Sequence, residues 1–172
     1  MKEFILPDFT HSNINVSATL AEFLGAPNGN ATLPIIKKEL AKNYKNVVFI
    51  CFDGMGVHPL SVNLAETDFL RANVKDMLTS TFPSTTTCAT TSLTTNRLPL
   101  EHGWFGWSVY FDKLKRNVNI FLDTDSWTDE KIDVAGSSPL AVFPYYFDQA
   151  DENCKYAINT VFPVFVKVAH PE

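Results

Sequence analysis

The sequence has little positive charge and few cysteines. Its 14 Lys and Arg residues are outnumbered by 19 Asp and Glu residues, and the net charge of −5 leaves no basic surface for a nucleic-acid duplex. Three widely spaced cysteines without a CxxC pair indicate neither a disulfide framework nor a zinc cluster. The apolar stretch within Met1 to Pro7 is too short for a signal peptide or a membrane span. We therefore expect a cytoplasmic protein without a nucleic-acid or membrane partner.

The strongest structural signal is an apolar run, Val47-Val48-Phe49-Ile50-Cys51-Phe52. A continuous β-rich run of this kind is typical of a strand covered on both faces in a largely parallel sheet. Helices are predicted before it, at 17–24 with Ser17 as N-cap and from Thr32 to about Asn43, and after it, at about 60–74. The predicted fold class is α/β, with a mostly parallel sheet flanked by helices.

Further elements follow this run. Residues 77–82 are predicted to form a short β segment that ends at Pro83, and a helix should start near Thr86 with Ala89 and Leu93 facing the sheet. The alternating aromatic region 104–122 predicts two strands joined by a turn at 113–117. The segment 156–168 still has the composition of a core, so the domain looks truncated.

One candidate site residue is Asp53, which directly follows the predicted strand and precedes Gly54 and Gly56. Ligands of an open α/β sheet bind at the carboxyl ends of its strands, and a carboxylate placed there suits a divalent metal ion. Asp-Gly after a strand is also an ordinary turn. Taken alone, Asp53 leaves both interpretations open.

The other candidate is a hydroxyl cluster at the start of the next predicted helix, Ser84-Thr85-Thr86-Thr87. A helix N-terminus has free N–H groups and the positive end of the macrodipole, so it binds a phosphoryl oxygen and favours an alkoxide nucleophile. Ser and Thr are also preferred N-caps, so this segment alone does not establish a site.

Together the two segments resemble the opening of the alkaline phosphatase superfamily, most closely its nucleotide pyrophosphatase/phosphodiesterase branch. The resemblance runs from residues 47–54 through Thr81-Phe82-Pro83-Ser84-Thr85-Thr86 to Glu101-His102-Gly103. It implies that residues 1–172 are the N-terminal portion of a single alkaline-phosphatase-like catalytic domain.

The spacing of the family motif selects the nucleophile. A Pro commonly lies three residues before it, and a Thr-Gly pair lies nine and ten residues after it. Counted from Thr86, these positions hold Pro83, Thr95 and Asn96. Thr86 is therefore the predicted nucleophile, and the fallbacks in order are Thr85, Ser84 and Thr81. Asn96 replaces the usual Gly, and Ala89 replaces a phosphate-binding Asn of phosphodiesterases, so the substrate stays open.

The resemblance implies a metal-dependent phosphoester hydrolase that acts on a small phosphorylated substrate such as a nucleotide. Two divalent ions, typically zinc, activate the nucleophile, and attack gives a phospho-threonine intermediate that water hydrolyses. Asp53 and Thr86 would bind the same ion. Because both follow the carboxyl ends of neighbouring predicted strands, their side-chain oxygens should lie within about 8 Å of each other. The other Asp and His ligands of the family are not found in this sequence. The second metal site is thus not evident, and the chain alone is expected to be inactive.

The remaining ligand types give no clear site. None of the four histidines, His11, His58, His102 and His170, has an Asp partner at ligand spacing, so we expect surface or core roles for them. The acids Asp123, Asp125, Asp129 and Asp133 lack the Gly and closing Glu of an EF-hand and should form a solvated stretch.

Two alternative functions remain. The chain could be a non-catalytic lobe that binds a phosphorylated metabolite or a partner chain. A related transferase or sulfatase is the other alternative, but neither Cys88 nor Ser84 lies in the Cys/Ser-x-Pro-x-Arg setting of a sulfatase nucleophile.

Overall fold

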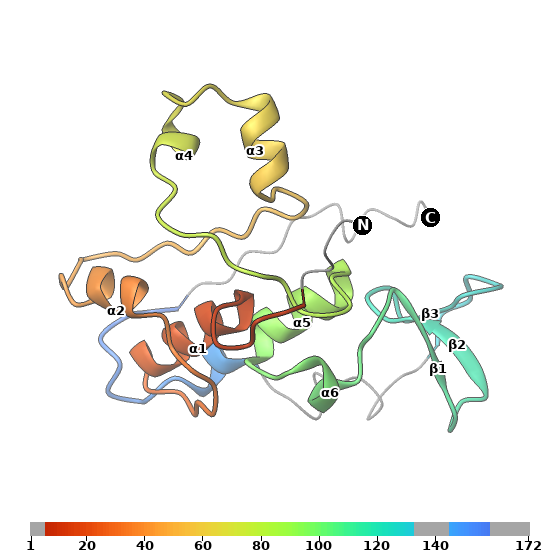
Figure 1. Cartoon of the computed structure of the whole chain (residues 1–172). Helices are drawn as coiled ribbons and strands as arrows, with labels where there is room; N and C mark the ends of the chain where they lie inside the picture. Colours follow the sequence, from red (N-terminus) through yellow and green to blue (C-terminus); the bar gives the residue numbers. More distant parts are fainter. Residues whose placement is uncertain (1–5, 133–144, 159–172) are drawn as a thin grey trace.

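The computed structural model describes residues 6–132 and 145–158. Its elements in chain order are α1 (Asn13–Phe23), α2 (Pro34–Leu40), α3 (Val57–Asn63), α4 (Phe69–Ala72), α5 (Thr86–Thr95), α6 (Pro99–His102), β1 (Ser108–Phe111), β2 (Arg116–Asn119), β3 (Thr124–Asp125) and the 3-10 helix η1 (Tyr146–Gln149). Figure 1 shows α1 and α5 at the centre, the strands at one side, and α3 and α4 projecting away. No helix in these residues has the length and apolar character needed to cross a bilayer.

The core lies where α1 packs on α5. Four small or medium side chains are fully buried there or close by: Ile14, Ala18 and Ala21 of α1, and Cys88 of α5. Such side chains let helices approach closely, and η1 then packs on both helices. Its buried Tyr146 joins an apolar cluster with Ala21, which extends the core toward the end of the described chain.

A buried asparagine fixes the start of α1. Asn15 accepts the Ser12 N–H through Oδ1 at 2.7 Å, and its Nδ2 donates to the carbonyls of Phe9 at 3.0 Å and Ala31 at 2.9 Å. Ser12 is the N-cap of α1. The prediction of Ser17 as N-cap is therefore wrong, because Ser17 is buried inside the helix and its hydroxyl donates to a carbonyl of the preceding turn.

The sheet differs from the predicted one. β1, β2 and β3 form a three-stranded antiparallel sheet in that order. Val109 of β1 lies opposite Val118 of β2, and the intervening residues 112–115 confirm the turn predicted at 113–117. The prediction of a mostly parallel sheet flanked by helices is wrong for the described residues. The predicted packing of α5 on such a sheet is therefore wrong as well.

The apolar run at 47–52 explains this difference. These residues belong to no strand of the described chain, and Val48 and Ile50 are 77% and 63% exposed. A strand that is apolar on both faces needs neighbours on both sides and covered faces, which the described segments do not supply. The β segment predicted at 77–82 forms only one isolated parallel bridge, between Thr79 and Ser12.

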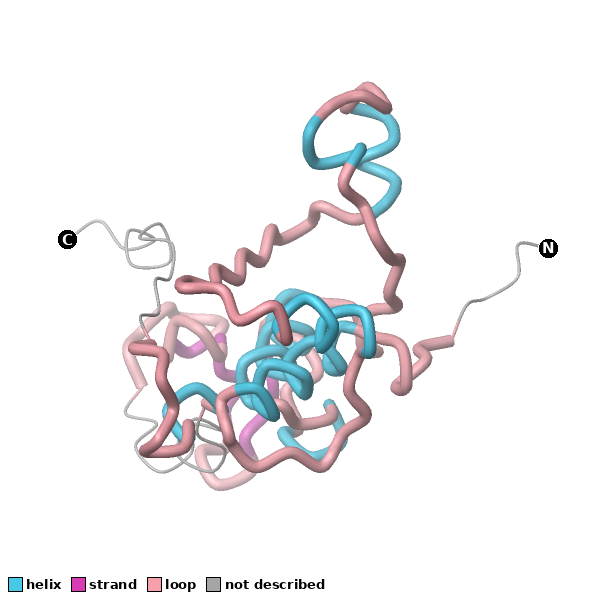
Figure 2. Tube along the Cα trace, turned by 90° about the vertical axis from the view of Figure 1, so that its left-hand side faces the viewer, coloured by secondary structure: helices cyan, strands magenta, loops and turns pink. Residues whose placement is uncertain are grey.

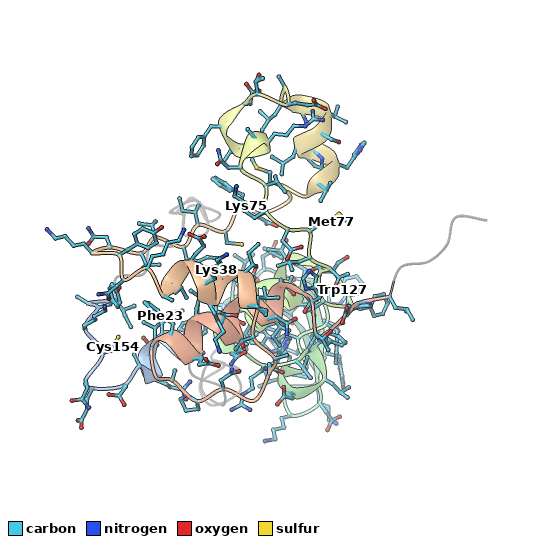
Figure 3. The ribbon with its side chains drawn as sticks, turned by 60° about the vertical axis from the view of Figure 1, so that its left-hand side comes forward. Phe23, Lys38, Lys75, Met77, Trp127 and Cys154 are labelled. Atoms are coloured by element: carbon cyan, nitrogen blue, oxygen red, sulfur yellow. The ribbon has the colours of Figure 1, made fainter. Side chains whose placement is uncertain are left out.

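Residues 46–80 form an outer arm that leaves the helical body and returns to it. Figure 2 shows its two short helices separated from the other helices by loop segments. Two short helices, α3 and α4, replace the single helix predicted at about 60–74, and Arg71 ties them together by donating to the carbonyls of Ser61 and Leu64. Lys75 and Met77 lie on the connection back to the body (Figure 3), where Met77 is 66% exposed.

Candidate functional site

The structure brings the two predicted site residues together. Thr86 Oγ1 donates to Asp53 Oδ2 over 3.2 Å, although the residues are 33 positions apart in the sequence. Both residues are exposed, Asp53 on the outer arm and Thr86 on the helical body. The predicted proximity is confirmed, and the roles of nucleophile and metal ligand stay predictions.

Thr86 is the first residue of α5, as predicted. Thr85 is the N-cap, but its side chain makes no capping hydrogen bond, and its Oγ1 lies 3.3 Å from Thr87 Oγ1 instead. The N–H groups in the first turn of a helix have no partner within the helix. Because this end also carries the partial positive charge of the helix, the backbone next to the Thr86 hydroxyl suits a phosphoryl oxygen.

The buried side of α5 holds the helix against α1. Leu93 is 7% exposed and Ala89 is half-buried, which agrees with the predicted apolar side. The Ala89 carbonyl accepts a hydrogen bond from Asn13 Nδ2 at 3.4 Å. The N-terminus of α5 is thereby positioned by a neighbouring helix.

Burial separates the alternative nucleophiles. Thr81 is 1% exposed, and its hydroxyl donates to a backbone carbonyl and to Cys88 Sγ. Burial raises the pKa of the Cys88 thiol, so this group is unsuited to attack. Ser84 and Thr85 are exposed, but of the hydroxyls in this cluster it is the one on Thr86 that bonds to the carboxylate.

The two oxygens fit adjacent positions on one divalent ion. Zinc–oxygen bonds measure about 2.0–2.2 Å, so two ligands of a tetrahedral ion lie about 3.4 Å apart. The observed separation is 3.2 Å. Within residues 6–132 and 145–158, no group of three or more His, Cys, Asp or Glu side chains could hold a metal ion. The donors therefore fit part of a metal site.

One histidine has an acidic partner that the sequence did not reveal. His11 Nε2 lies 3.2 Å from Asp76 Oδ1, and the two residues are 65 positions apart, well beyond the spacing of any ligand motif. The contact joins the segment before α1 to the outer arm. His58 is exposed in α3, and His170 lies outside the described residues.

His102 is held in α6 by hydrogen bonds at both ring nitrogens. Nδ1 accepts the Trp104 N–H at 3.0 Å, so the proton of the neutral ring is on Nε2, which donates to Ser92 Oγ at 2.9 Å. Burial lowers the pKa of His102 to about 4, against the opposing effect of the Glu101 carboxylate. Because Nε2 carries the proton, His102 cannot act as a base toward Ser92, and the pair is structural.

Asp125 departs from the predicted solvated acidic stretch, whereas Asp123 and Asp129 are exposed as predicted. The Asp125 residue is 7% exposed, and its carboxylate accepts the N–H groups of Trp127 at 2.9 Å and Thr128 at 3.1 Å. The Trp127 N–H is the main reason that the pKa of Asp125 is lowered. This carboxylate stabilises the turn after β3, whereas Asp133 lies outside the described residues.

Comparisons of the chain with protein-family models, with curated proteins and with solved structures find no match.

Proposed function

We propose that this chain carries the nucleophile side of a cytoplasmic, metal-dependent phosphoester hydrolase of the phosphodiesterase or nucleotide pyrophosphatase kind. The observation that carries the proposal is the Thr86 hydroxyl in the first turn of α5, bonded to the Asp53 carboxylate. An exposed hydroxyl, a helix N-terminus and a carboxylate meet at this point. Together they offer a nucleophile, an anion site and a metal ligand.

In this proposal Thr86 supplies the attacking oxygen. Its Oγ1 bonds to phosphorus while the hydroxyl proton passes to the Asp53 carboxylate and the bond from phosphorus to the leaving-group oxygen breaks. Water then hydrolyses the phospho-threonine, which releases the phosphorylated product and restores the Thr86 hydroxyl. The first N–H groups of α5 bind a phosphoryl oxygen, and Asp53 orients the hydroxyl. A divalent ion at Asp53 and Thr86, zinc by the family resemblance, would supply Lewis-acid activation of the hydroxyl. The helix dipole contributes only about 0.3–1 kcal/mol, so Thr86 by itself is a weak nucleophile.

The partial ligand set favours a second candidate function. Two oxygen donors hold a divalent ion loosely, whereas two-metal catalysis needs enough ligands to keep both ions about 4 Å apart. A non-catalytic lobe that binds a phosphorylated metabolite or a partner chain requires only the anion site. For the same reason we expect turnover by the chain alone to be far below that of a complete enzyme.

The test combines binding and turnover measurements on the purified chain. Orthovanadate binding is measured in the presence of zinc or manganese, and hydrolysis is followed with chromogenic phosphodiester and phosphomonoester substrates. Asp53→Ala and Thr86→Ala should each abolish vanadate binding and any slow hydrolysis. Thr90→Ala, which removes a hydroxyl one turn further along α5, serves as the matched control and should change neither.

The outcomes separate the two candidates. Slow hydrolysis that requires Asp53 and Thr86 supports the hydrolase, and binding without hydrolysis favours the non-catalytic lobe. Binding and hydrolysis that are unchanged in both variants would refute the assignment of this site.

A further inference from the structure

The outer arm exposes the apolar run at 47–52 along its whole length. Every residue of the run is exposed, and Val48 and Ile50 present most of their surface to solvent. Figure 1 shows this part of the chain where it crosses from α2 to α3. Consecutive exposed apolar side chains of this kind mark interaction sites, because leaving them in water is unfavourable. The run is therefore a candidate contact surface.

The backbone of the run is free to pair with another strand. In the part of the chain that the structure describes, the N–H and C=O groups of residues 45–52 make no backbone hydrogen bond to another residue. No turn or bend interrupts residues 46–52, and none of them has a positive φ. An uninterrupted segment with unpaired backbone groups is a template to which a second strand can be added.

The charges at the two ends of the run select the partner strand. Lys45 lies four residues before Phe49, and Asp53 lies four residues after it. When two copies of the run pair antiparallel with Phe49 opposite itself, Lys45 of each copy lies opposite Asp53 of the other. Opposite charges directly across two strands are stabilising, and like charges there are destabilising. A parallel pairing in register would place like charges together, so the charges favour an antiparallel pair of identical strands.

Both charged groups are available for such a contact. Lys45 is exposed and forms none of the ion pairs found among the described residues. Asp53 is exposed as well, and its Oδ2 accepts the hydrogen bond from Thr86 Oγ1. Its Oδ1 has no hydrogen-bond partner among the described residues. The contact with Thr86 and a contact with a second copy would therefore use different oxygens of Asp53.

The apolar side chains match in the same register. Val48 of each copy lies opposite Ile50 of the other, and the two Phe49 side chains lie opposite each other. Aromatic and β-branched pairs are among the cross-strand pairs that stabilise antiparallel sheets. One register thus satisfies both the charged ends and the apolar centre of the run.

We infer that this surface binds a second copy of the chain, through antiparallel pairing of residues 45–53 about a two-fold axis at Phe49. A two-fold axis uses the same patch on both subunits, so each attractive pair occurs twice. Two short strands form a small interface, so the dimer is weak and reversible. The inference goes beyond the proposed hydrolase and does not require it, because Asp53 takes part only through its charge.

The test is sedimentation-velocity ultracentrifugation of the full chain from about 5 μM to about 500 μM, a range that covers weak interfaces. The weight-average sedimentation coefficient of the wild type should rise with concentration from the monomer value toward the dimer value. Val48→Lys places a charge within the paired strands and should raise the Kd of the dimer about 10-fold or more. Because Val48 is 77% exposed, this substitution should leave the monomer folded, which circular dichroism checks.

The matched control is Val62→Lys. It adds the same charge at a 67% exposed position of α3, on the same arm but outside the run, and it should leave the Kd unchanged. A wild type that stays monomeric over the whole range would overturn the inference. Equal Kd values in Val48→Lys and the wild type, or equal weakening by Val48→Lys and Val62→Lys, would also overturn it.

A pair of charge reversals tests the register. Lys45→Glu creates two like-charged pairs with Asp53 in its own dimer, and Asp53→Lys does the same with Lys45, so each variant alone should dimerise about 10-fold more weakly. An equimolar mixture restores opposite charges at both pairs of the mixed dimer. At the same total concentration the mixture should therefore sediment faster than either variant. Loss of the Thr86 bond cannot explain this rescue, because Asp53→Lys lacks that bond in both samples. A mixture that sediments no faster than its components would overturn the inference.

Discussion

Acidification from about pH 7 to about pH 5 is expected to destabilise the fold through His102. Burial lowers its pKa from 6.5 in the unfolded chain to about 4 in the folded chain. Between these values the unfolded chain binds a proton that the folded chain does not, so the free energy of unfolding falls as the pH falls. Above pH 6.5 the imidazole is neutral in both the folded and the unfolded chain, so it does not reduce the free energy of unfolding. Below pH 4 the reduction reaches its full value of about 3 kcal/mol, and about 2 kcal/mol of it is already present at pH 5.

Other groups act in a different pH range. The carboxylates of Asp76 and Asp125 have pKa values lowered from 3.8 by hydrogen bonds, and for Asp76 also by its contact with His11. Their stabilising effect is present above that value and is lost only as the pH falls below about 4. These carboxylates stay charged from pH 7 to pH 5, and the comparison with a His102 variant then separates the effect of the buried imidazole.

The assay is urea unfolding, followed by tryptophan fluorescence at several pH values, of the wild type and His102→Asn. The asparagine oxygen can replace Nδ1 as acceptor for the Trp104 N–H. The variant should be less stable overall but nearly independent of pH in this interval. Glu101→Gln should lower the pKa of His102 further in an NMR titration, because it removes the neighbouring negative charge. Equal pH dependence in the wild type and His102→Asn would refute the reasoning.

Two further predictions concern stability. Asn15→Ala should lower the free energy of unfolding in urea by about 2–4 kcal/mol because it leaves buried polar groups unpaired. Asn63→Ala, at an exposed amide, should change the free energy of unfolding by less than about 0.5 kcal/mol. Equal effects of the two substitutions would contradict the role of the buried network. Gly25→Ala should cost about 1–3 kcal/mol, because Gly25 has φ of +71° and an added Cβ would lie 2.5 Å from Asp151 Cβ. Gly29→Ala, whose Cβ would meet no described atom within 4 Å, should leave the thermal midpoint unchanged, and equal losses in both variants would argue against this explanation.

Features encoded by neighbouring residues could be predicted from the sequence. The turn at 113–117 was signalled by polar residues between two alternating segments, and the observed turn lies at 112–115. The start of α5 at Thr86 was signalled by Pro83 and the hydroxyl cluster that follows it. Its proximity to Asp53 was also predicted, although the expected reason was adjacent parallel strands and the described chain has none.

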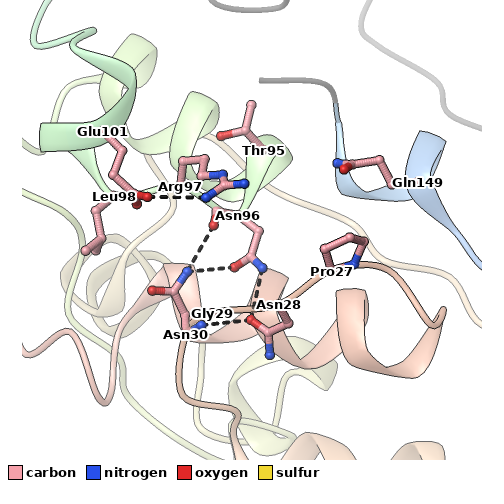
Figure 4. Close-up of a pocket in the computed structure, with 10 residues that line it drawn as sticks. All are labelled: Pro27, Asn28, Gly29, Asn30, Thr95, Asn96, Arg97, Leu98, Glu101 and Gln149. Carbon is pink, nitrogen blue, oxygen red and sulfur yellow. Dashed lines mark hydrogen bonds and ion pairs between the residues drawn. The ribbon is translucent and has the colours of Figure 1, made fainter. Parts of the chain in front are cut away.

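Features that depend on distant residues could not be predicted. The run at 47–52 has the composition of a buried strand, but a strand also needs partners, and composition does not identify them. Ser17 resembles an N-cap by type, yet α1 starts earlier because Asn15 binds the Ser12 N–H and reaches Ala31. A pocket of about 410 Å³ combines residues of the loop between α1 and α2 with the end of α5 (Figure 4), and no sequence motif links those segments.

The position of Asp53 on the outer arm has a thermodynamic consequence. Its hydrogen bond to Thr86 closes a loop of 33 residues. Closing a flexible loop of that length costs about 3 kcal/mol of chain entropy. The His11–Asp76 and Ser12–Thr79 contacts share this cost because they also tie the arm to the body, and one exposed hydrogen bond returns only about 1 kcal/mol. A metal ion or phosphoryl group that contacts both residues would supply the missing free energy by mass action. Ligand binding and ordering of the arm would then be linked, and each would strengthen the other.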